Sequence, residues 1–429
     1  MSEAEPALQS VEPIPPKATQ IAPFSPMRWK FALSSLTVHF VAACKRPVSR
    51  DAFLRLVAEF VRLAPQLRLS VNPDRNGHAD PGCVSTDAEG KVLGFEQVCR
   101  YSEVAEFEPN LAGHLEPRSD IYDDRLPAFR ALGEISATPG PHGTRSLLSM
   151  ALAHTLFDGA DLARTLSGLP AANPGEDDTA GTKPMPVLRN AALWLAAVPM
   201  AVAYLFIAGR EKRQADDFRF VALSMDAPAL KTAADRKGVG VPALLLAFVL
   251  RGLLLDPRGE GTATAIYMRI PRQRFHGQED RFLHARTELL KFKGSPDLSD
   301  FVASVAGHLR SRGFGATSMP FLTSRMLAVI RKLHRKAPWL VPERFKGFAP
   351  ADIIFSVVPE LDPKGPFSEF SDAVMFGGTC TGTTPSCIVV TGPRATTLTF
   401  WIEKAGLDER LQRLTQLFEQ EGMAVTRWS

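Results

Sequence analysis

The sequence predicts a two-lobed α/β protein. Its 429 residues, 45% of them hydrophobic and 22% charged, have an ordinary globular composition and are enough for two domains of typical size. Strand-like and helix-like patterns intermix in both halves, as they do in α/β folds. A polar stretch rich in proline and glycine, residues 170–187, separates the halves and has the composition of a linker or loop.

These features give a domain plan. The N-terminus is acidic and rich in proline and has no apolar core, so we expect a disordered tail rather than a secretory signal. The two halves do not visibly repeat one another. The predicted units are a tail over 1–26, a first lobe over 27–188, an apolar inter-lobe segment over 189–214 and a second lobe over 215–429.

In the first half, local signals mark where elements begin and end. A β-rich alternation ends the stretch 27–41. The helical period of 49–63 starts at Ser49, a candidate N-cap, and stops before a proline. Further strands are predicted over 67–71 and, as an uninterrupted apolar run, over 147–152.

The second half shows the same mixture. Asp226 is a candidate helix cap, and an apolar helix carries Pro242 in its first turn, where proline is tolerated. Gly377 and Gly378 precede several threonines and are interpreted as part of a hairpin, because no lysine or helix N-terminus follows to form a phosphate loop. The predicted strands lie at 218–224, 264–270, 352–358, 386–391 and 396–402, and the predicted helices at 242–253, 298–311, 320–336 and from a cap at Asp408 to about 421.

Charge, cysteine and histidine patterns exclude several classes of function. The net charge is only +4, and no Lys/Arg blocks interleave with aromatic residues, so no nucleic-acid partner is expected. The five cysteines lack C-x-x-C spacing, which argues against a disulfide framework or a structural zinc site and fits a reducing, cytoplasmic compartment. The nine histidines show no metal-ligand spacing, so no metal site is expected.

One segment departs from this soluble pattern. Residues 191–208 contain no charge and are at the lower edge of the length that spans a bilayer. Pro199 near the middle and a lobe on each side argue against a spanning helix. A buried inter-lobe helix and a membrane-docking helix both remain open, and we favour peripheral contact, at the inner face of the membrane. Cations flank the run, at Arg189 on one side and at Arg210, Lys212 and Arg213 on the other.

The most informative pattern is a His-x-x-x-Asp-Gly motif formed by His154, Asp158 and Gly159. It follows the predicted strand 147–152 and precedes the helical spacing of 160–169. A strand fixes the backbone before the histidine, and the glycine permits a tight bend after it. Histidine titrates near neutrality, so an imidazole presented in this way suits a general base. The alternative is a structural loop histidine, with Asp158 serving as a helix cap.

Together these residues resemble the CoA-dependent acyltransferase superfamily, and within it the bacterial wax ester synthase/diacylglycerol acyltransferase-like branch. The resemblance covers most of residues 30–421. The local matches are Ala64–Arg68 to h-P-x-L-R, Pro127–Phe129 partly to P-L-W, Ala153–Gly159 to His-His-x-x-x-Asp-Gly, Ile270–Arg274 to V-P-x-x-x-R and Ser356–Pro359 to S-N-V-P. The departures are Ala153 for the first histidine, Val357 for the asparagine, and Pro242-Ala243 for an Asn-Asp pair.

The resemblance implies two chloramphenicol-acetyltransferase-like lobes, with mixed sheets flanked by helices and a channel between them. It implies that His154 deprotonates an acceptor hydroxyl or amine, which attacks an acyl thioester directly, with no acyl-enzyme and no bound cofactor. Asp158 and Gly159 then support the catalytic loop, and Asp158 forms an ion pair with an arginine. By position, Arg272 and Arg274 are the candidates for that arginine.

The leading hypothesis is therefore an O-acyltransferase that uses acyl-CoA or an acyl-carrier-protein thioester and an alcohol. Two alternatives stay open: a condensation-like enzyme that forms esters or amides in secondary metabolism, and a non-catalytic relative that binds a lipid or a carrier. The helix at 320–336 ends in a basic cluster, Arg331, Lys332, Arg335 and Lys336. The helix dipole explains such cations, and so does a surface for anionic lipid, CoA phosphates or an acyl carrier protein.

Overall fold

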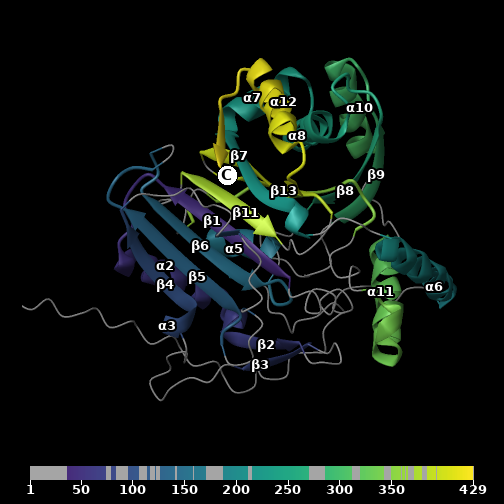
Figure 1. Ribbon diagram of the computed structural model, residues 1–429, viewed down its shortest axis with the longest axis horizontal. Coiled ribbons are helices and arrows are strands. Elements are labelled where there is room, and N and C mark those ends of the chain that lie inside the picture. The colour runs from purple at the N-terminus through teal and green to yellow at the C-terminus, as the bar shows by residue number, and fades with distance from the viewer. Residues whose placement is uncertain are drawn as a thin grey trace, which may run out of the picture.

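The structure is a computed structural model, and its described residues form two large sheets, one two-stranded sheet and the helices around them (Figure 1). They are residues 36–73, 79–83, 95–105, 114–115, 121, 126–140, 143–157, 159–170, 187–210, 215–269, 286–311, 319–342, 349–358, 360–362, 364–365, 372–378, 384–392 and 394–428. The predicted tail, 1–26, lies outside these ranges, and the lobe boundaries at 189–214 stay a prediction.

The first sheet has five strands in the order β11-β1-β6-β5-β4. Only β4 and β5 run parallel, and the other neighbours are antiparallel. Every residue of β1 and β6 is buried, which accounts for their continuous apolar sequences. The strands are β1 (Thr37–Cys44), β4 (Cys99–Val104), β5 (Phe129–Ser136), β6 (Ser146–Ala153) and β11 (Ala373–Gly378).

Helices α2 (Arg50–Leu63) and α5 (Gly159–Leu166) cover one face of this sheet and share its main core. Ser49 caps α2 as predicted, because its hydroxyl accepts a hydrogen bond from the Ala52 N–H. The predicted strand at 67–71 is partly wrong, since its first two residues belong to a 3₁₀ turn, η2 (Pro65–Arg68). A small sheet of β2 (Leu69–Pro73) and β3 (Ala79–Cys83) follows, with α3 (Phe95–Val98) before β4.

The second sheet has seven strands in the order β14-β7-β13-β12-β10-β8-β9. Helices α7 (Ala227–Arg236), α8 (Val241–Val249), α10 (Leu298–Ser311) and α12 (Leu407–Gln420) lie on one of its faces (Figure 1) and contribute to one large apolar core. Asp226 caps α7 as predicted, accepting from the Ala229 N–H at 2.7 Å. The strands are β7 (Phe218–Asp226), β8 (Thr262–Arg269), β9 (Arg286–Lys293), β10 (Ile353–Val357), β12 (Ser386–Thr391), β13 (Ala395–Glu403) and β14 (Val425–Trp428).

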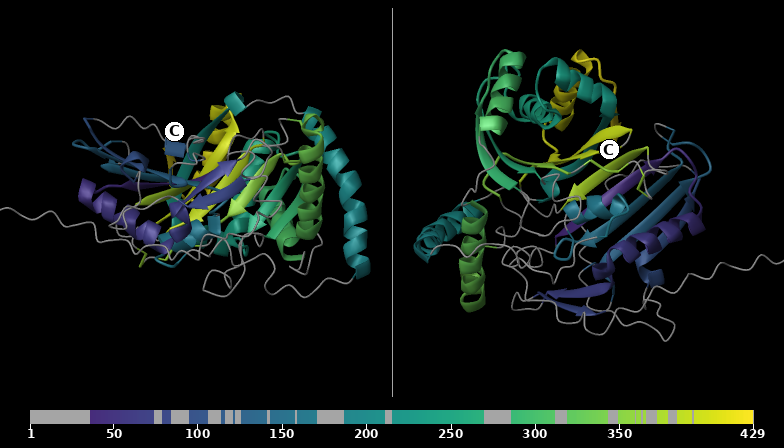
Figure 2. Two further views of the ribbon diagram at one scale, coloured as in Figure 1. Left: turned by 90° about the horizontal axis from the view of Figure 1, so that it is seen from below. Right: turned by 180° about the vertical axis from the view of Figure 1, so that it is seen from behind.

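Strand β11 links the two halves, because it follows β10 of the second sheet in sequence but pairs with β1 of the first, in the register Phe40 to Phe376. The predicted hairpin at Gly377 and Gly378 is therefore wrong. These glycines end a strand that crosses between the lobes, which lie side by side in Figure 2. A shared apolar cluster, which includes Val41 and Met375 of the first sheet and Phe220 of the second, packs the two sheets together.

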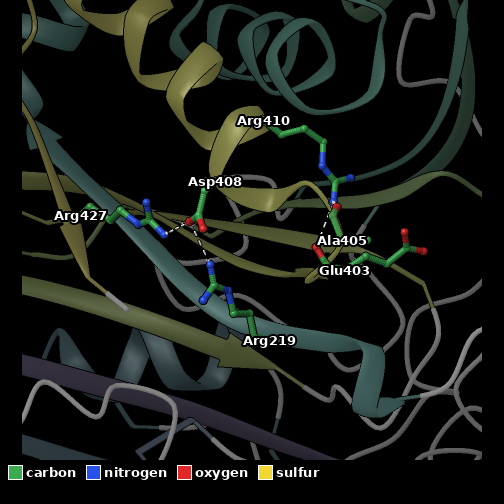
Figure 3. Close-up of polar contacts among 6 residues, drawn as sticks. All are labelled: Arg219, Glu403, Ala405, Asp408, Arg410 and Arg427. Carbon is green, nitrogen blue, oxygen red and sulfur yellow. Dashed lines mark hydrogen bonds and ion pairs between the residues drawn. The ribbon is translucent and has the colours of Figure 1, made fainter.

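Charged side chains form hydrogen bonds at the edge of the second sheet (Figure 3). Asp408 accepts hydrogen bonds from Arg427 on β14, at 2.6 Å, and from Arg219 on β7, at 3.1 Å. The hydrogen bond from Arg427 is the main cause that lowers the pKa of this carboxyl. The expectation that Asp408 caps α12 is wrong, because Gly406 occupies the cap with φ 62° and Asp408 lies in the first turn.

The apolar segment forms helix α6 (Val187–Arg210), which packs against α11 (Met319–Lys336). One stretch within α6, Ala191–Gly209, is long and apolar enough to cross a membrane, and only 28% of it is buried. The helix is therefore not buried between the lobes, and that alternative is wrong. Short 3₁₀ turns, η5 (Ala215–Asp217) and η7 (Pro338–Leu340), follow α6 and α11, and a π turn, η6 (Leu250–Leu254), extends α8.

Two helical glycines give a matched test of packing in the second lobe. A Cβ on Gly252 in η6 would lie 2.8 Å from the Cα of Leu414 in α12, so backbone has to move. A Cβ on Gly307 in α10 would meet nothing within 4 Å. We predict that Gly252→Ala lowers the free energy of unfolding by about 1–3 kcal/mol, whereas Gly307→Ala raises it by up to about 1 kcal/mol. Urea titration of both variants measures the difference, and equal effects would contradict the close approach of η6 to α12.

Candidate active site

The turn after β6 holds the candidate catalytic histidine in a fixed backbone. The His154 N–H donates to the Leu36 carbonyl at 2.9 Å, and the preceding Ala153 N–H donates to the Ala128 carbonyl at 3.0 Å. The N–H groups of Leu156 and Phe157 then both donate to the Ala153 carbonyl. These four bonds fix the turn to strand β6 and to the segments on either side of it.

The His154 side chain is fixed by the same turn. Its Nδ1 lies 3.1 Å from the Phe157 carbonyl oxygen. A carbonyl oxygen can only accept, so Nδ1 carries the proton of the neutral imidazole and Nε2 keeps its lone pair. The ring is partly exposed, whereas Thr155, Leu156 and Phe157 are buried. The local geometry therefore holds one imidazole nitrogen ready to accept a proton, which is what a general base requires.

Phe157 fixes the position of that carbonyl. Its ring is fully buried and packs against Phe60 of α2, with 5.8 Å between ring centroids, and Phe60 packs against Phe40 of β1 at 5.6 Å. This aromatic row ties the turn to the helix and the sheet of the first lobe. A displacement of the turn would have to disrupt the core of that lobe, so packing rigidifies the orientation of His154.

The second half of the chain approaches the turn from the other side. A Cβ on Gly159 would lie 4.0 Å from the Val358 side chain, which follows β10 directly. The Asp362 N–H donates to the Ser167 hydroxyl, just beyond α5, at 3.0 Å, and Gly365 packs against the Leu166 carbonyl. The His154 turn and α5 therefore lie where the two halves meet.

Arg68 ends the 3₁₀ turn η2, and the sequence predicts no role for it beyond the h-P-x-L-R match. It is 5% exposed, and burial lowers the pKa of its guanidinium. Its neighbour Leu67 belongs to the cluster that contains Phe157, and its neighbour Leu69 belongs to the cluster that contains Leu156. Arg68 is therefore a buried cation whose chain neighbours share their apolar clusters with residues of the candidate catalytic turn. In the sequence, the only signal that pointed to Arg68 was its place in the h-P-x-L-R match, and that match gave no indication that the side chain is buried.

The first-sheet face opposite α2 also carries buried polar groups. Thr37 and His39 are each 1% exposed, and their Oγ1 and Nε2 atoms form a hydrogen bond two residues apart on β1. Farther along, His114 forms hydrogen bonds to Ser149, at 2.9 Å, and to Glu134, at 3.1 Å. The hydrogen bond from His114 is the main cause that lowers the pKa of Glu134. Alternation along β1 could have placed His39 on this face, but nothing in the sequence indicated its burial.

Several predicted site residues cannot be placed. Asp158, Arg272 and Arg274 lie outside the described residues, as does Pro359 of the S-N-V-P match. The structure therefore brings Gly159 of the motif close to Val358 of the S-N-V-P match, and the ion pair of Asp158 stays a prediction.

Other catalytic chemistry finds little support among the described residues. Burial raises the pKa of the Cys44 and Cys99 thiols to about 12, and raises that of Cys387 well above its ordinary value, so none of the three is a ready nucleophile. No group of three or more His, Cys, Asp or Glu side chains in the described ranges could hold a metal ion.

Comparison with solved structures identifies the fold. Trichothecene 15-O-acetyltransferase from Fusarium sporotrichioides superimposes with a TM-score of 0.61 at 10% identity, covering 95% of this chain and 99% of that one. The wax ester synthase/diacylglycerol acyltransferase from Marinobacter aquaeolei VT8 gives 0.51 at 12% identity, covering 94% and 100%. This chain has the two-lobed, chloramphenicol-acetyltransferase-like fold.

Condensation domains of peptide synthetases share the same fold. The first condensation domain of the calcium-dependent antibiotic synthetase gives a TM-score of 0.52 at 14% identity, covering 94% of this chain and 96% of that one. No protein-family model and no curated protein matches the sequence. The predicted α/β fold class and the resemblance to the acyltransferase and condensation-domain fold are thus confirmed at the level of structure.

The His114–Glu134 contact predicts a pH-dependent contribution to stability. Because the folded-state pKa of Glu134 is lowered, its ionised form stabilises the fold above the ordinary pKa of 4.5, and this contribution is lost as the pH falls through the folded-state pKa. We predict that Glu134→Gln costs about 1 kcal/mol of unfolding free energy at neutral pH, and that the cost shrinks below pH 4.5. Thermal melts of the variant and the parent protein, from neutral pH to below pH 4.5, measure this cost. Glu103→Gln, at an exposed carboxylate, is the control. A pH-independent cost would contradict the assignment.

Proposed function

We propose that this protein transfers an acyl group from a thioester, of CoA or of an acyl carrier protein, to an acceptor hydroxyl. The observation that carries the proposal is the His154 imidazole, whose Nδ1 donates to the Phe157 carbonyl, so that the lone pair of the neutral ring is on Nε2. The likeness to an acetyltransferase fold supports acyl transfer in particular.

In the proposed reaction, Nε2 of His154 accepts the proton of the acceptor hydroxyl as the oxygen attacks the thioester carbonyl carbon. The tetrahedral intermediate then collapses with cleavage of the C–S bond, and the imidazolium returns the proton to the leaving sulfur. The products are an ester and a free thiol, and His154 ends neutral. No acyl-enzyme is required, in keeping with the raised pKa values of the three described cysteines.

The acceptor can also be an amine, in which case the same steps form an amide. Similarity to a condensation domain, at 14% identity, supports this second function and a carrier-bound donor. This second function also stays open because Ala153 replaces the first histidine of the family motif. The remaining alternative is a protein that binds a lipid or a carrier without catalysis. The presence of His154 in a turn fixed by backbone hydrogen bonds argues against this alternative.

An assay with graded acyl-CoA chain lengths against a panel of alcohols and amines, following free thiol, tests the proposal. We predict thiol release that requires an acceptor, and we predict that His154→Ala lowers turnover by at least about 10² without loss of fold, the scale of a lost general base. His308→Ala, at a histidine on α10 in the second lobe, is the matched control and retains turnover. Turnover near normal in His154→Ala would contradict the assignment of His154 as the general base. A parent protein that is inactive with every acyl-CoA but active with an acyl-carrier-protein thioester would show that the donor is carrier-bound.

We further propose that Arg68 is the partner of Asp158 in its ion pair. The candidates predicted from the sequence, Arg272 and Arg274, are the alternatives. Arg68 is buried, and a buried guanidinium is costly unless an anion compensates it. Its chain neighbours Leu67 and Leu69 belong to the same apolar clusters as Phe157 and Leu156, the residues that precede Asp158. Such a pair would hold the catalytic loop, where small displacements of a reacting group strongly reduce the rate.

A double-mutant cycle tests this pair. We predict that Arg68→Met and Asp158→Asn each lower stability by about 3 kcal/mol, because each breaks the proposed ion pair of the buried Arg68, and that the double variant is little worse than either. Asp161→Asn, at a buried acid in the first turn of α5, is the control and adds to Arg68→Met. Additivity with Asp158→Asn would point to Arg272 or Arg274. A shifted pH–rate profile at unchanged stability would instead give Asp158 a direct part in proton transfer.

A further inference from the structure

Helix α6 is apolar on all sides but covered on only one. Its buried positions form a single stripe, Leu193, Ala197, Ala201, Leu205 and Ala208, spaced about one turn apart. Within this stripe, Ala201 and Leu205 form one apolar cluster with Met326, Leu327 and Ile330 of α11. A surface helix of a soluble protein normally presents polar residues on its other face. In α6 that face carries no charge between residues 191 and 209.

Large hydrophobic side chains are exposed almost exclusively here. Nine of them are exposed in the described part of the chain, and Leu289 alone lies outside α6 and the η7 turn that follows α11. Leu195 and Val202 are 77% and 64% exposed, and Trp339 is 80% exposed. The others are Trp194, Val198, Phe206, Ile207 and Leu340. A contiguous apolar surface of this kind marks a site of interaction.

The two helices run in the same direction, so their C-terminal ends lie together. Arg325, early in α11, lies over the ring of Trp194, early in α6, with 5.9 Å to the ring centroid. At the other end, a Cβ on Gly209 would lie 3.5 Å from Pro342, just beyond η7. The helices stand side by side as an outer layer of the molecule (Figures 1 and 2). Phe206 and Ile207 therefore share one end with η7.

Cations gather at this same end. Lys332, Arg335 and Lys336 are exposed in the last turns of α11. Neither α6 nor α11 contains a single Asp or Glu. The helix dipole alone explains cations at a helix C-terminus, but it does not explain why the adjoining surface is apolar. A surface that exposes tryptophan, aliphatic side chains and lysine has the composition that suits the interface of an anionic bilayer.

We propose that this ridge, formed by α6, the C-terminal half of α11 and η7, docks onto the surface of an anionic lipid bilayer. A second copy of the chain would offer the same apolar and cationic surface with no carboxylate to pair with it. A spanning helix is disfavoured because α6 packs along α11, whose arginines and lysines would be drawn into the hydrocarbon core. The inference does not depend on the proposed acyl transfer.

Flotation of the full-length protein with vesicles tests the proposal without any acyl donor. We expect binding to phosphatidylcholine vesicles that contain about 30 mol% phosphatidylglycerol, weak binding to phosphatidylcholine alone, and release by about 0.5 M salt as charges are screened. Lys332→Glu/Lys336→Glu should weaken binding roughly thirtyfold or more, given the contribution of each cation near an anionic surface. Lys231→Glu/Arg258→Glu, which makes the same charge change on exposed residues of the second lobe, should leave binding unchanged.

The apolar contribution is tested by Leu195→Gln/Val198→Gln/Val202→Gln, at three exposed positions outside the buried stripe of α6. We expect this variant to melt like the parent protein and to lose vesicle binding. Binding equal to that of the parent protein, or no binding of the parent protein to any vesicle, would overturn the proposal. A particle of twice 46.8 kDa that the triple variant converts to a monomer would assign the ridge to self-association instead. Extraction that requires detergent rather than salt would assign it to a spanning helix.

Discussion

The hydrogen bond from Nδ1 of His154 to the Phe157 carbonyl is the interaction on which the functional account depends. It determines which imidazole nitrogen keeps a lone pair, and hence whether this histidine can act as a base. The bond exists because the chain turns sharply after β6 and because Phe157 is anchored in the first-lobe core. The fold positions the candidate base through core packing rather than through a flexible loop.

The same turn lies where the two halves of the chain meet. Strand β11 completes the first sheet with residues from the second half, and Val358 reaches Gly159 from the end of β10. Each lobe therefore contributes to the surroundings of His154, and neither half of the chain forms the site alone.

The sequence predicted the elements that local physics determines. Ser49 and Asp226 were recognised as caps because short polar side chains satisfy free N–H groups at helix starts, and the apolar run before His154 was recognised as a buried strand. It did not predict the partner of β11, because strand pairing between distant segments leaves no local pattern. Asp408 looked like a cap because of its residue type, whereas its carboxylate binds two arginines from distant strands. The burial of Arg68 and the one-sided covering of α6 likewise depend on tertiary packing.

The tautomer of His154 is the most direct test of the account. In a ¹⁵N-labelled sample, long-range ¹H–¹⁵N correlations distinguish protonated from unprotonated ring nitrogens, and comparison with His154→Gln assigns this ring among the nine histidines. Above the pH at which the ring becomes neutral, the account predicts a protonated Nδ1 and an unprotonated Nε2. A neutral His154 that carries its proton on Nε2 would contradict it, because the nitrogen assigned to proton abstraction would then have no lone pair to offer.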